Sequence, residues 1–234
     1  LENLVAILDP GSPATVFVVN YAPVHLLLHA LTWQLVGEQT PAYHVVNVLL
    51  HAIGAALLAA VFVRAGLSRL VGIGAALVFL VHPANVEAVA WIFQVKSIVA
   101  LLCGLLALTC AERHPGLASL FFVLGLLTKI SAAFALPVFA TQLWCRHVQG
   151  ERVQFRDLRT LGLWLGLLAA VAVPVAATIA RAVPIHDPYP DLWTHARSSV
   201  ALAMRYLAMA ASGYGTAAFQ EPPPALSPFD PWWL

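Results

Sequence analysis

The feature that most limits the fold of this chain is a series of apolar segments, each ended by a few charged or turn-forming residues. The longest runs from residue 41 to residue 64, and as an α-helix it would measure about 36 Å. That length exceeds the roughly 30 Å of hydrocarbon in a bilayer. Charged residues make up only 10% of the sequence, against about 25% in soluble domains. The sequence therefore predicts an integral membrane protein.

Hydropathy predicts an all-α, polytopic transmembrane helix bundle of about six to seven spans. After the first span, the expected ones are 67–80, 97–111, 116–128, 131–144 and 161–179. Pro174 lies inside the last of these and predicts a kink there. The segment 196–212 fits a seventh span or a helix at the membrane surface equally well, because it carries Arg197 and Arg205.

The chain divides into three parts on composition. Residues 1–40 predict an external loop with an interfacial helix over 24–36, which is short for a crossing and carries His25 and His29 on one side. A span is the alternative for this helix. Residues 41–212 form the predicted bundle, and residues 213–234 form a proline-rich external or interfacial tail.

Arginine residues gather in three of the predicted connections, and these connections lie on one side of the membrane. The seven residues are Arg64, Arg69, Arg113, Arg146, Arg152, Arg156 and Arg159. Because cytoplasmic loops carry an excess of Lys and Arg, that side is predicted to be cytoplasmic. The formal net charge of +1 gives no reason to expect a nucleic-acid partner.

Polar side chains are concentrated between His82 and Lys96, in a stretch that the topology places on the opposite, non-cytoplasmic face. Pro83 suits the first turn of a helix, after which Glu87, Trp91 and Gln94 would share one face. A carboxylate there can serve as a base or orient an acceptor, or it can pair with Lys96. His82, Asn85, Trp91 and Gln94 are therefore candidate site residues together with Glu87.

His44, Asn47 and His51 form a polar stripe on the first span, because they are three and four residues apart. The stripe has two interpretations: hydrogen bonds between helices, or the lining of a site. No Asp or Glu accompanies the histidines at ligand spacing, and Cys103, Cys110 and Cys145 show no metal-binding pattern. We therefore expect no metal.

Lys96 and Lys129 are the only lysines, and both are predicted at non-cytoplasmic ends of spans. Their long side chains can reach the interface from there without any ligand. A lipid-linked phosphate would explain both positions better, because ammonium groups are suitable point charges for phosphate. Ser97 and Ser131 follow closely in the sequence and can add hydroxyl donors.

Four motifs, in this order, resemble the GT-C membrane glycosyltransferases, and most closely the O-mannosyltransferase-like proteins that often carry tetratricopeptide repeats. Residues 20–24, including Tyr21, resemble the family's Tyr-Arg-Pro-Leu motif. Residues 43–51 resemble its His-x-x-Asn-x-x-x-His helix, and residues 82–91 its His-Pro-x-x-x-Glu-Ala-Val-Ala-Trp segment. Thr128-Lys129 resembles the Ser-Lys-Glu turn. The resemblance covers residues 20 to about 140.

This resemblance implies transfer of a sugar from a polyprenyl-phosphate donor to an acceptor on the non-cytoplasmic face, with inversion and without a nucleotide sugar. It implies that Lys96 and Lys129 bind the phosphate of the donor and that Glu87 and His82 have secondary catalytic roles. It also implies a cavity lined by the residues Tyr21, His44, Asn47, His51, Asn85, Trp91 and Gln94. The partners would be membrane lipid, the lipid-linked sugar phosphate, and a protein acceptor or other membrane subunits.

The sequence also departs from the family pattern. The family's acidic catalytic pair follows a first transmembrane helix, and neither precedes Leu1; Ala22 and Ile130 replace the family's Arg and Glu. We therefore expect an N-terminally truncated, inactive fragment, from a bacterial inner membrane with the site facing the periplasm. The alternatives are a non-catalytic transmembrane subunit that keeps the scaffold, and a solute transporter, for which the sequence shows no internal repeat.

Overall fold

The computed structural model describes residues 2–17, 21–181, 191–213 and 215, and all regular elements within these ranges are helical. The predicted tail therefore lies almost entirely outside the described residues. The α-helices are α1 (Glu2–Leu8), α2 (Pro13–Phe17), α3 (Pro23–Val36), α4 (Thr40–Arg64), α5 (Arg69–Val81), α6 (Val86–Ala90), α7 (Val95–Cys110), α8 (Pro115–Thr128), α9 (Ala135–Val148), α10 (Phe155–Arg181) and α11 (Leu192–Ser212). Three short 3-10 helices are η1 (Pro83–Asn85), η2 (Ile92–Gln94) and η3 (Ile130–Phe134).

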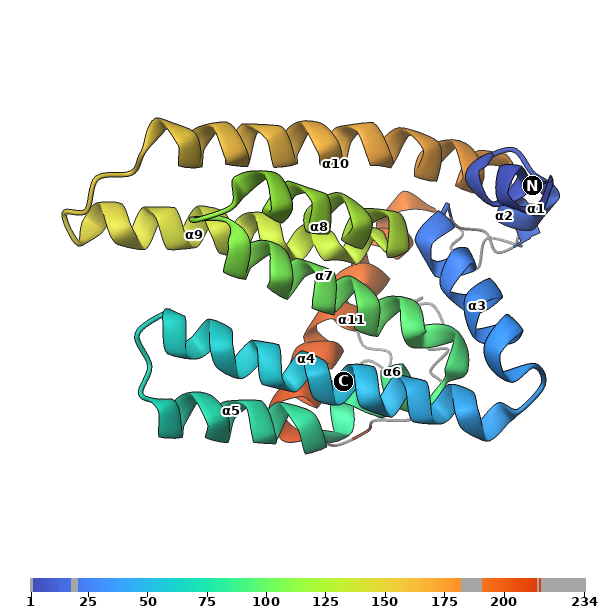
Figure 1. Ribbon diagram of the computed structural model, residues 1–234, viewed down its shortest axis with the longest axis horizontal. Helices are drawn as coiled ribbons and strands as arrows, with labels where there is room; N and C mark the ends of the chain where they lie inside the picture. The colour runs from blue at the N-terminus through green and yellow to red at the C-terminus, as the bar shows by residue number, and fades with distance from the viewer. Residues whose placement is uncertain (1, 18–20, 182–190, 214, 216–234) are drawn as a thin grey trace.

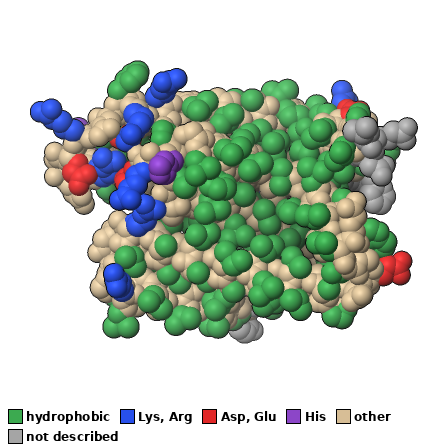
Figure 2. Space-filling model, viewed as in Figure 1, with side chains coloured by type: hydrophobic (Ala, Val, Ile, Leu, Met, Phe, Trp, Pro, Cys, Tyr) green, Lys and Arg blue, Asp and Glu red, His purple; other side chains and the backbone are tan. Residues whose placement is uncertain are grey.

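The helices α4, α5, α7, α8, α9 and α10 run roughly parallel to one another and alternate in direction along the chain, and α11 crosses behind them (Figure 1). The connections α4–α5, α7–α8 and α9–α10 all lie toward the left end of this view, whereas α3 and α6 lie toward the right. Charged side chains gather at the left end in Figure 2, and hydrophobic side chains cover the middle of the same face. An apolar surface between charged ends is the pattern of a bundle that sits in a bilayer.

Among the described residues, three helical segments are long and apolar enough to cross a membrane: Thr40–Arg64, Ile92–Cys110 and Phe155–Arg181. A fourth is possible if Arg69–Val81 and Pro83–Ala90, which meet at a bend of 53°, form one broken span. The helix α8 has 14 residues, or about 21 Å, which is short of the hydrocarbon thickness. The integral membrane class is supported, and the count of six to seven spans stays a prediction.

Several helix bounds agree with the predicted segments, and α10 is longer than expected. The predicted span 161–179 becomes a 27-residue helix that continues through Pro174 to Arg181. The hydroxyl of Thr178 donates to the carbonyl of Pro174 at 2.9 Å. The extra residues at both ends of α10 carry charges, which a hydropathy pattern counts against a span although they can lie in the headgroup region.

The core lies between α7, α8, α9 and α10, and its centre is an aromatic group around Trp164. The indole of Trp164 is fully buried, stacks on Phe122 with ring centroids 4.5 Å apart, and packs against Phe139 at 5.2 Å. Its Nε1 donates to the hydroxyl of Ser119 at 3.1 Å, which satisfies the only polar atom of the indole. This core fixes the helices whose ends carry Lys96 and Lys129.

Gly125 in α8 should not tolerate a side chain, because a Cβ atom there would lie 2.9 Å from the Cβ of Ala132 and 3.1 Å from that of Cys103. We expect Gly125→Ala to destabilise the protein by about 1–3 kcal/mol through overpacking. Thermal unfolding of the purified protein in detergent measures the effect. Gly116→Ala in the same helix is the matched control, since it meets nothing within 4 Å and should be neutral or stabilising. Equal melting temperatures for the two variants would contradict this packing.

Candidate functional site

The candidate site lies at the end of the bundle opposite to the arginine-rich connections (Figure 1). It is built where α3, α6, η2, the start of α7 and the turn after α8 approach one another. The two lysines of the chain reach it from different places, Lys96 from the first turn of α7 and Lys129 from the residue that ends α8. Distant parts of the sequence thus contribute to one group of side chains.

A chain of hydrogen bonds connects Lys129 with Glu87. The ammonium of Lys129 donates to the hydroxyl of Ser97 at 2.7 Å, and this hydroxyl donates to Oε1 of Gln94 at 2.6 Å. The Nε2 atom of Gln94 then donates to Oε1 of Glu87 at 3.2 Å. These three hydrogen bonds link four side chains into one network, which restricts the orientation of each side chain.

Lys96 lies over the ring of Phe93, with its ammonium 4.4 Å from the ring centroid. This distance is within the range of a cation–π contact, which stabilises a cation without neutralising it. Lys96 forms no salt bridge with a carboxylate of the described residues. The ion pair between Glu87 and Lys96 that the sequence left open is therefore not the contact that Glu87 makes in the described structure.

Two histidines of α3 pack against the same phenylalanine. His25 is 1% exposed, and its ring centroid lies 4.6 Å from Phe93 and 4.5 Å from His29. Neither ring nitrogen of His25 has a hydrogen-bond partner among the described residues, and the same holds for Nε2 of His29. Buried polar atoms of this kind are nearly always paired, so these nitrogens are the donors and acceptors that a ligand or water would satisfy.

The electrostatic surroundings keep both histidines neutral. Burial, followed by the charges of His29, Lys96 and Lys129 in that order, lowers the pKa of His25 to about 3. Burial also lowers the pKa of His29, with a smaller effect of Lys96. Each neutral ring has one N–H donor. The group of Lys96, Lys129, His25 and His29 thus contains two ammonium ions and N–H donors of the histidines, and the carboxylate near it is that of Glu87. Such a group suits an anion.

These shifted pKa values predict that the protein loses stability below pH 6.5. The folded protein holds His25 neutral, whereas the unfolded chain binds a proton at the ordinary pKa of 6.5. The free energy of unfolding should therefore fall as the pH is lowered from 6.5 toward 3, by up to about 1.4 kcal/mol per pH unit for this one group. His25→Phe should reduce the slope, and the exposed control His114→Phe should not. Melting temperatures from pH 7.5 to 5 measure it; parallel curves for wild type and His25→Phe would contradict the assignment.

Two members of the polar stripe on α4 hold helices together. The amide of Asn47, 1% exposed, donates to the carbonyls of Val89 at 3.2 Å and Trp91 at 3.3 Å. A ring nitrogen of His51 lies 3.1 Å from the carbonyl of Leu80, at the end of α5. His44 is half-buried on the same helix, and no hydrogen bond joins it to the described residues. Of the two interpretations of the stripe, these contacts favour the first for Asn47 and His51.

The remaining predicted residues shape the turns around the site. A ring nitrogen of His82 accepts from the backbone N–H of Ala84 at 3.2 Å, and the amide of Asn85 donates to the carbonyl of Phe79. Trp91 breaks the helix that was expected to continue from Glu87 to Gln94, with φ −86° and ψ 112°. Tyr21, two residues before α3, donates to the carbonyl of Leu8 at 3.0 Å and so links the start of α3 to the end of α1.

His25, His29 and Phe93 are group members that sequence reasoning did not assign to the site. The signal available was the spacing of two histidines four residues apart after a helix-starting proline, which places them on one face. Nothing in the sequence connects that face with Lys129, about one hundred positions later. Among the described residues, no three His, Cys, Asp or Glu side chains converge as metal ligands would, and the two lysines also oppose a bound cation.

The comparisons with known proteins found one distant similarity. No protein-family model and no solved structure matches the chain. Over 96 residues it is 35% identical to a protein O-mannosyl-transferase, Tmtc1, of Drosophila melanogaster. The matched part is 41% of this chain but only 11% of that protein, so the chain spans a small part of the relative's length. Together with the apolar helices, this similarity fits a membrane glycosyltransferase.

Proposed function

We propose that this chain is part of a GT-C-type membrane glycosyltransferase and that it binds the phosphate of a polyprenyl-phosphate sugar. The observation that carries the proposal is the convergence of Lys96, Lys129, His25 and His29 at one end of the bundle, where His25 has unpartnered nitrogens and the nearby acid is Glu87. The similarity to an O-mannosyl-transferase supports the reaction class.

Lys96 and Lys129 would hold the phosphate of the donor by charge-assisted hydrogen bonds. In an inverting transfer, the acceptor hydroxyl loses its proton and its oxygen forms a bond to the anomeric carbon as the bond to the phosphate oxygen breaks. The lysines stabilise the negative charge that the leaving phosphate gains. Both are held in place without being neutralised, Lys96 by Phe93 and Lys129 by Ser97.

Glu87 and His82 would take supporting roles. Glu87 accepts from Gln94 and is connected through Ser97 to Lys129, so it orients the donor-binding lysine rather than the acceptor. The base that deprotonates the acceptor would come from an acidic pair that these 234 residues do not contain. We therefore expect the chain on its own to bind the donor without transferring the sugar.

The site would face away from the cytoplasm, because the arginine-rich connections lie at the other end of the bundle. In a bacterial inner membrane that side is the periplasm. The acceptor would be a protein hydroxyl or another molecule outside the cytoplasm, and further membrane subunits would provide what this chain lacks.

A binding assay with the purified chain in nanodiscs tests the proposal. A polyprenyl-phosphate hexose should bind at least about tenfold more tightly than the corresponding neutral polyprenol, since a charge-assisted hydrogen bond contributes about 1.5–3 kcal/mol. A nucleotide sugar should not compete. Equal binding of the neutral alcohol, or displacement by the nucleotide sugar, would refute donor recognition and favour a non-catalytic scaffold.

A further inference from the structure

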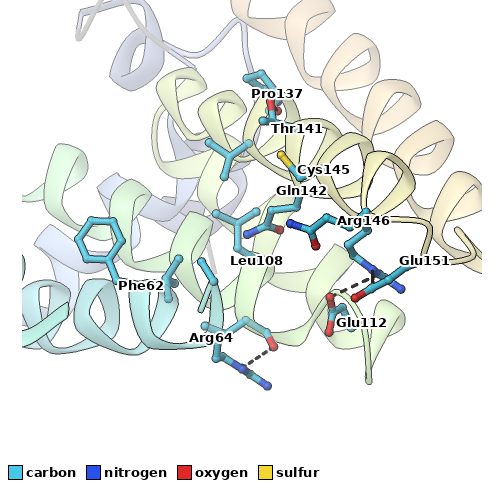
Figure 3. Close-up of a pocket in the computed structure, with 15 residues that line it drawn as sticks. Phe62, Arg64, Leu108, Glu112, Pro137, Thr141, Gln142, Cys145, Arg146 and Glu151 are labelled. Carbon is cyan, nitrogen blue, oxygen red and sulfur yellow. Dashed lines mark hydrogen bonds and ion pairs between the residues drawn. The ribbon is translucent and has the colours of Figure 1, made fainter. Parts of the chain in front are cut away.

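A cavity lies at the arginine-rich end of the bundle, and its lining includes neither lysine (Figure 3). Its volume is about 860 Å³, within the range of small-molecule sites. The ends of α4 and α7 and the length of α9 form its walls. Its apolar lining includes Val61, Phe62, Leu108, Pro137 and Val138. Its polar lining includes Arg64, Glu112, Gln142, Arg146, Gln149 and Glu151.

The two linings are separated along the membrane direction. The segments Thr40–Arg64 and Ile92–Cys110 are membrane-crossing candidates, so Arg64 and Glu112, at or just past their ends, lie at headgroup level. Val61, Phe62 and Leu108 precede those ends by up to one turn and lie deeper. The cavity is thus apolar toward the bilayer and charged toward the interface, which is the polarity of a membrane lipid.

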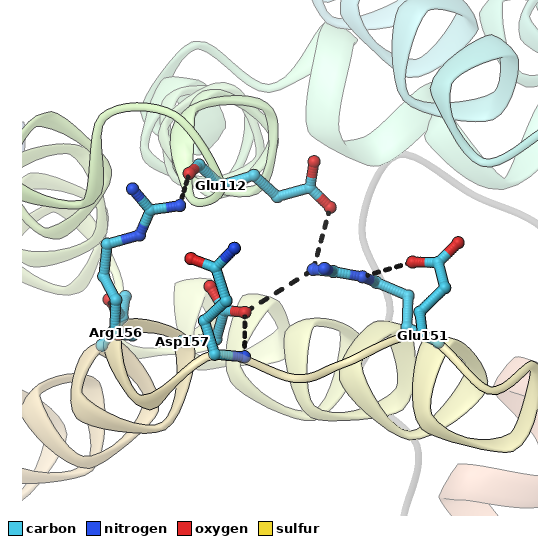
Figure 4. A network of polar contacts seen from close by, with 7 residues as sticks. Glu112, Glu151, Arg156 and Asp157 are labelled. Atoms are coloured by element: carbon cyan, nitrogen blue, oxygen red, sulfur yellow. Dashed lines mark hydrogen bonds and ion pairs between the residues drawn. The ribbon is translucent and has the colours of Figure 1, made fainter.

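The acidic side of the cavity is held by an arginine network (Figure 4). Arg146 contacts Oε1 of Glu112 at 3.4 Å, Oε2 of Glu151 at 3.0 Å and Oδ2 of Asp157 at 3.7 Å. Arg156 donates to the backbone carbonyl of Glu112. Glu112 and Glu151 each give one oxygen to Arg146, and their side chains remain 64% and 56% exposed, so both can accept a further hydrogen bond.

Arg64 is the basic group of the cavity that has no acid beside it. Its Nη1 atom donates to the carbonyl of Thr109 at 2.8 Å, which fixes the guanidinium at the rim. No carboxylate of the described residues lies within salt-bridge distance of it. A guanidinium has five N–H donors, so most of its donors remain for a phosphate.

We propose that this cavity binds a zwitterionic glycerophospholipid whose headgroup ends in a primary amine. The phosphate would accept from Arg64, the ammonium would donate to Glu112 and Glu151, and an acyl chain would lie along Val61, Phe62 and Val138. The charges select this class: two arginines and two exposed carboxylates line the cavity, so one end suits the phosphate and the other the ammonium.

The same charges disfavour the other common membrane lipids. An anionic phospholipid without an amine, such as phosphatidylglycerol, can use Arg64 but places nothing cationic against Glu112 and Glu151. A choline headgroup carries a positive charge but has no N–H to donate. The cavity contains no residue of the lysine and histidine group, so lipid binding here is independent of the proposed glycosyltransferase function.

Lipid exchange tests the inference on the purified 234-residue chain. The protein is incubated in nanodiscs of equal parts phosphatidylethanolamine, phosphatidylglycerol and phosphatidylcholine, and the lipids retained after transfer to detergent are measured by mass spectrometry. Phosphatidylethanolamine should be enriched at least about threefold over each of the others. Arg64→Gln and Glu112→Gln should each remove the enrichment, and Arg113→Gln, an exposed cation at the same end but outside the cavity, should keep it.

A second measurement guards against variants that fail to fold. Cys145 lines the cavity and is exposed, whereas Cys103 and Cys110 are less accessible. Its reaction with a maleimide should be several-fold slower in phosphatidylethanolamine nanodiscs than in phosphatidylglycerol nanodiscs, with wild-type protein. Equal retention of the three lipids by the wild-type protein, or equal Cys145 reactivity in the two kinds of nanodisc, would overturn the proposal.

Discussion

Replacing Lys96 and Lys129 together by methionine should weaken binding of a polyprenyl-phosphate sugar by at least about 100-fold. Each lysine is expected to contribute one charge-assisted hydrogen bond of about 1.5–3 kcal/mol, and two such bonds amount to a factor of 100 or more. Methionine keeps much of the length and the apolar stem of lysine, so the contact with Phe93 is disturbed little. Titration of the donor into nanodiscs measures the loss.

Arg113→Met is the matched control, because it removes an exposed cation at the other end of the bundle. It should leave donor affinity within about twofold. Equal donor affinity of the double lysine variant and the wild type would refute the anion site. The lysine side chains would then only extend to the membrane interface, without binding a ligand.

Asn47→Leu should lower the stability by about 2–3 kcal/mol. The change removes both hydrogen bonds to the carbonyls of Val89 and Trp91 and leaves these carbonyls without their donor. For a protein of this size, the melting temperature should fall by roughly 5–10 °C. Donor binding should weaken as well, because the break at Trp91 places Gln94 and Lys96.

His44→Leu is the control for this effect. It lies three residues earlier on the same helix, is half-buried, and shows no hydrogen bond to the described residues. Its melting temperature should change by less than about 2 °C in the same detergent. A small effect of Asn47→Leu, equal to that of His44→Leu, would show that the stripe does not connect α4 to the loop of Glu87.

The helical class, several helix bounds and the gathering of arginines at one end were predictable, because each depends on local properties of the sequence. The run from 41 to 64 became α4 almost unchanged, and the topology placed Lys96 and Lys129 at the same end of the bundle, as the structure does. The number of membrane spans was harder to predict from the sequence. The apolar run of 116–128 has the composition of a membrane helix, yet α8 is too short to cross alone, and only packing against α7 and α10 explains where it lies.

The details of the site depended on tertiary contacts that periodicity does not encode. A continuous helical face from Glu87 to Gln94 was predicted, but the helix breaks at Trp91. There the side-chain amide of Asn47 in α4 donates a hydrogen bond to the backbone carbonyl of Trp91. Glu87 and Gln94 still meet, through a hydrogen bond that helical spacing alone would not specify. The histidines of α3 join the lysines only because α3 packs near the end of α8.

The most direct test of the anion site is a structure of the chain, or of a longer protein that contains it, with a polyprenyl-phosphate sugar bound. We expect the phosphate within hydrogen-bond distance of the Nζ atoms of Lys96 and Lys129, with an N–H of His25 or His29 directed at it. If the phosphate of the sugar donor lay instead at the arginine-rich end, beside Arg64, with no donor between the lysines and the histidines, the account would be contradicted.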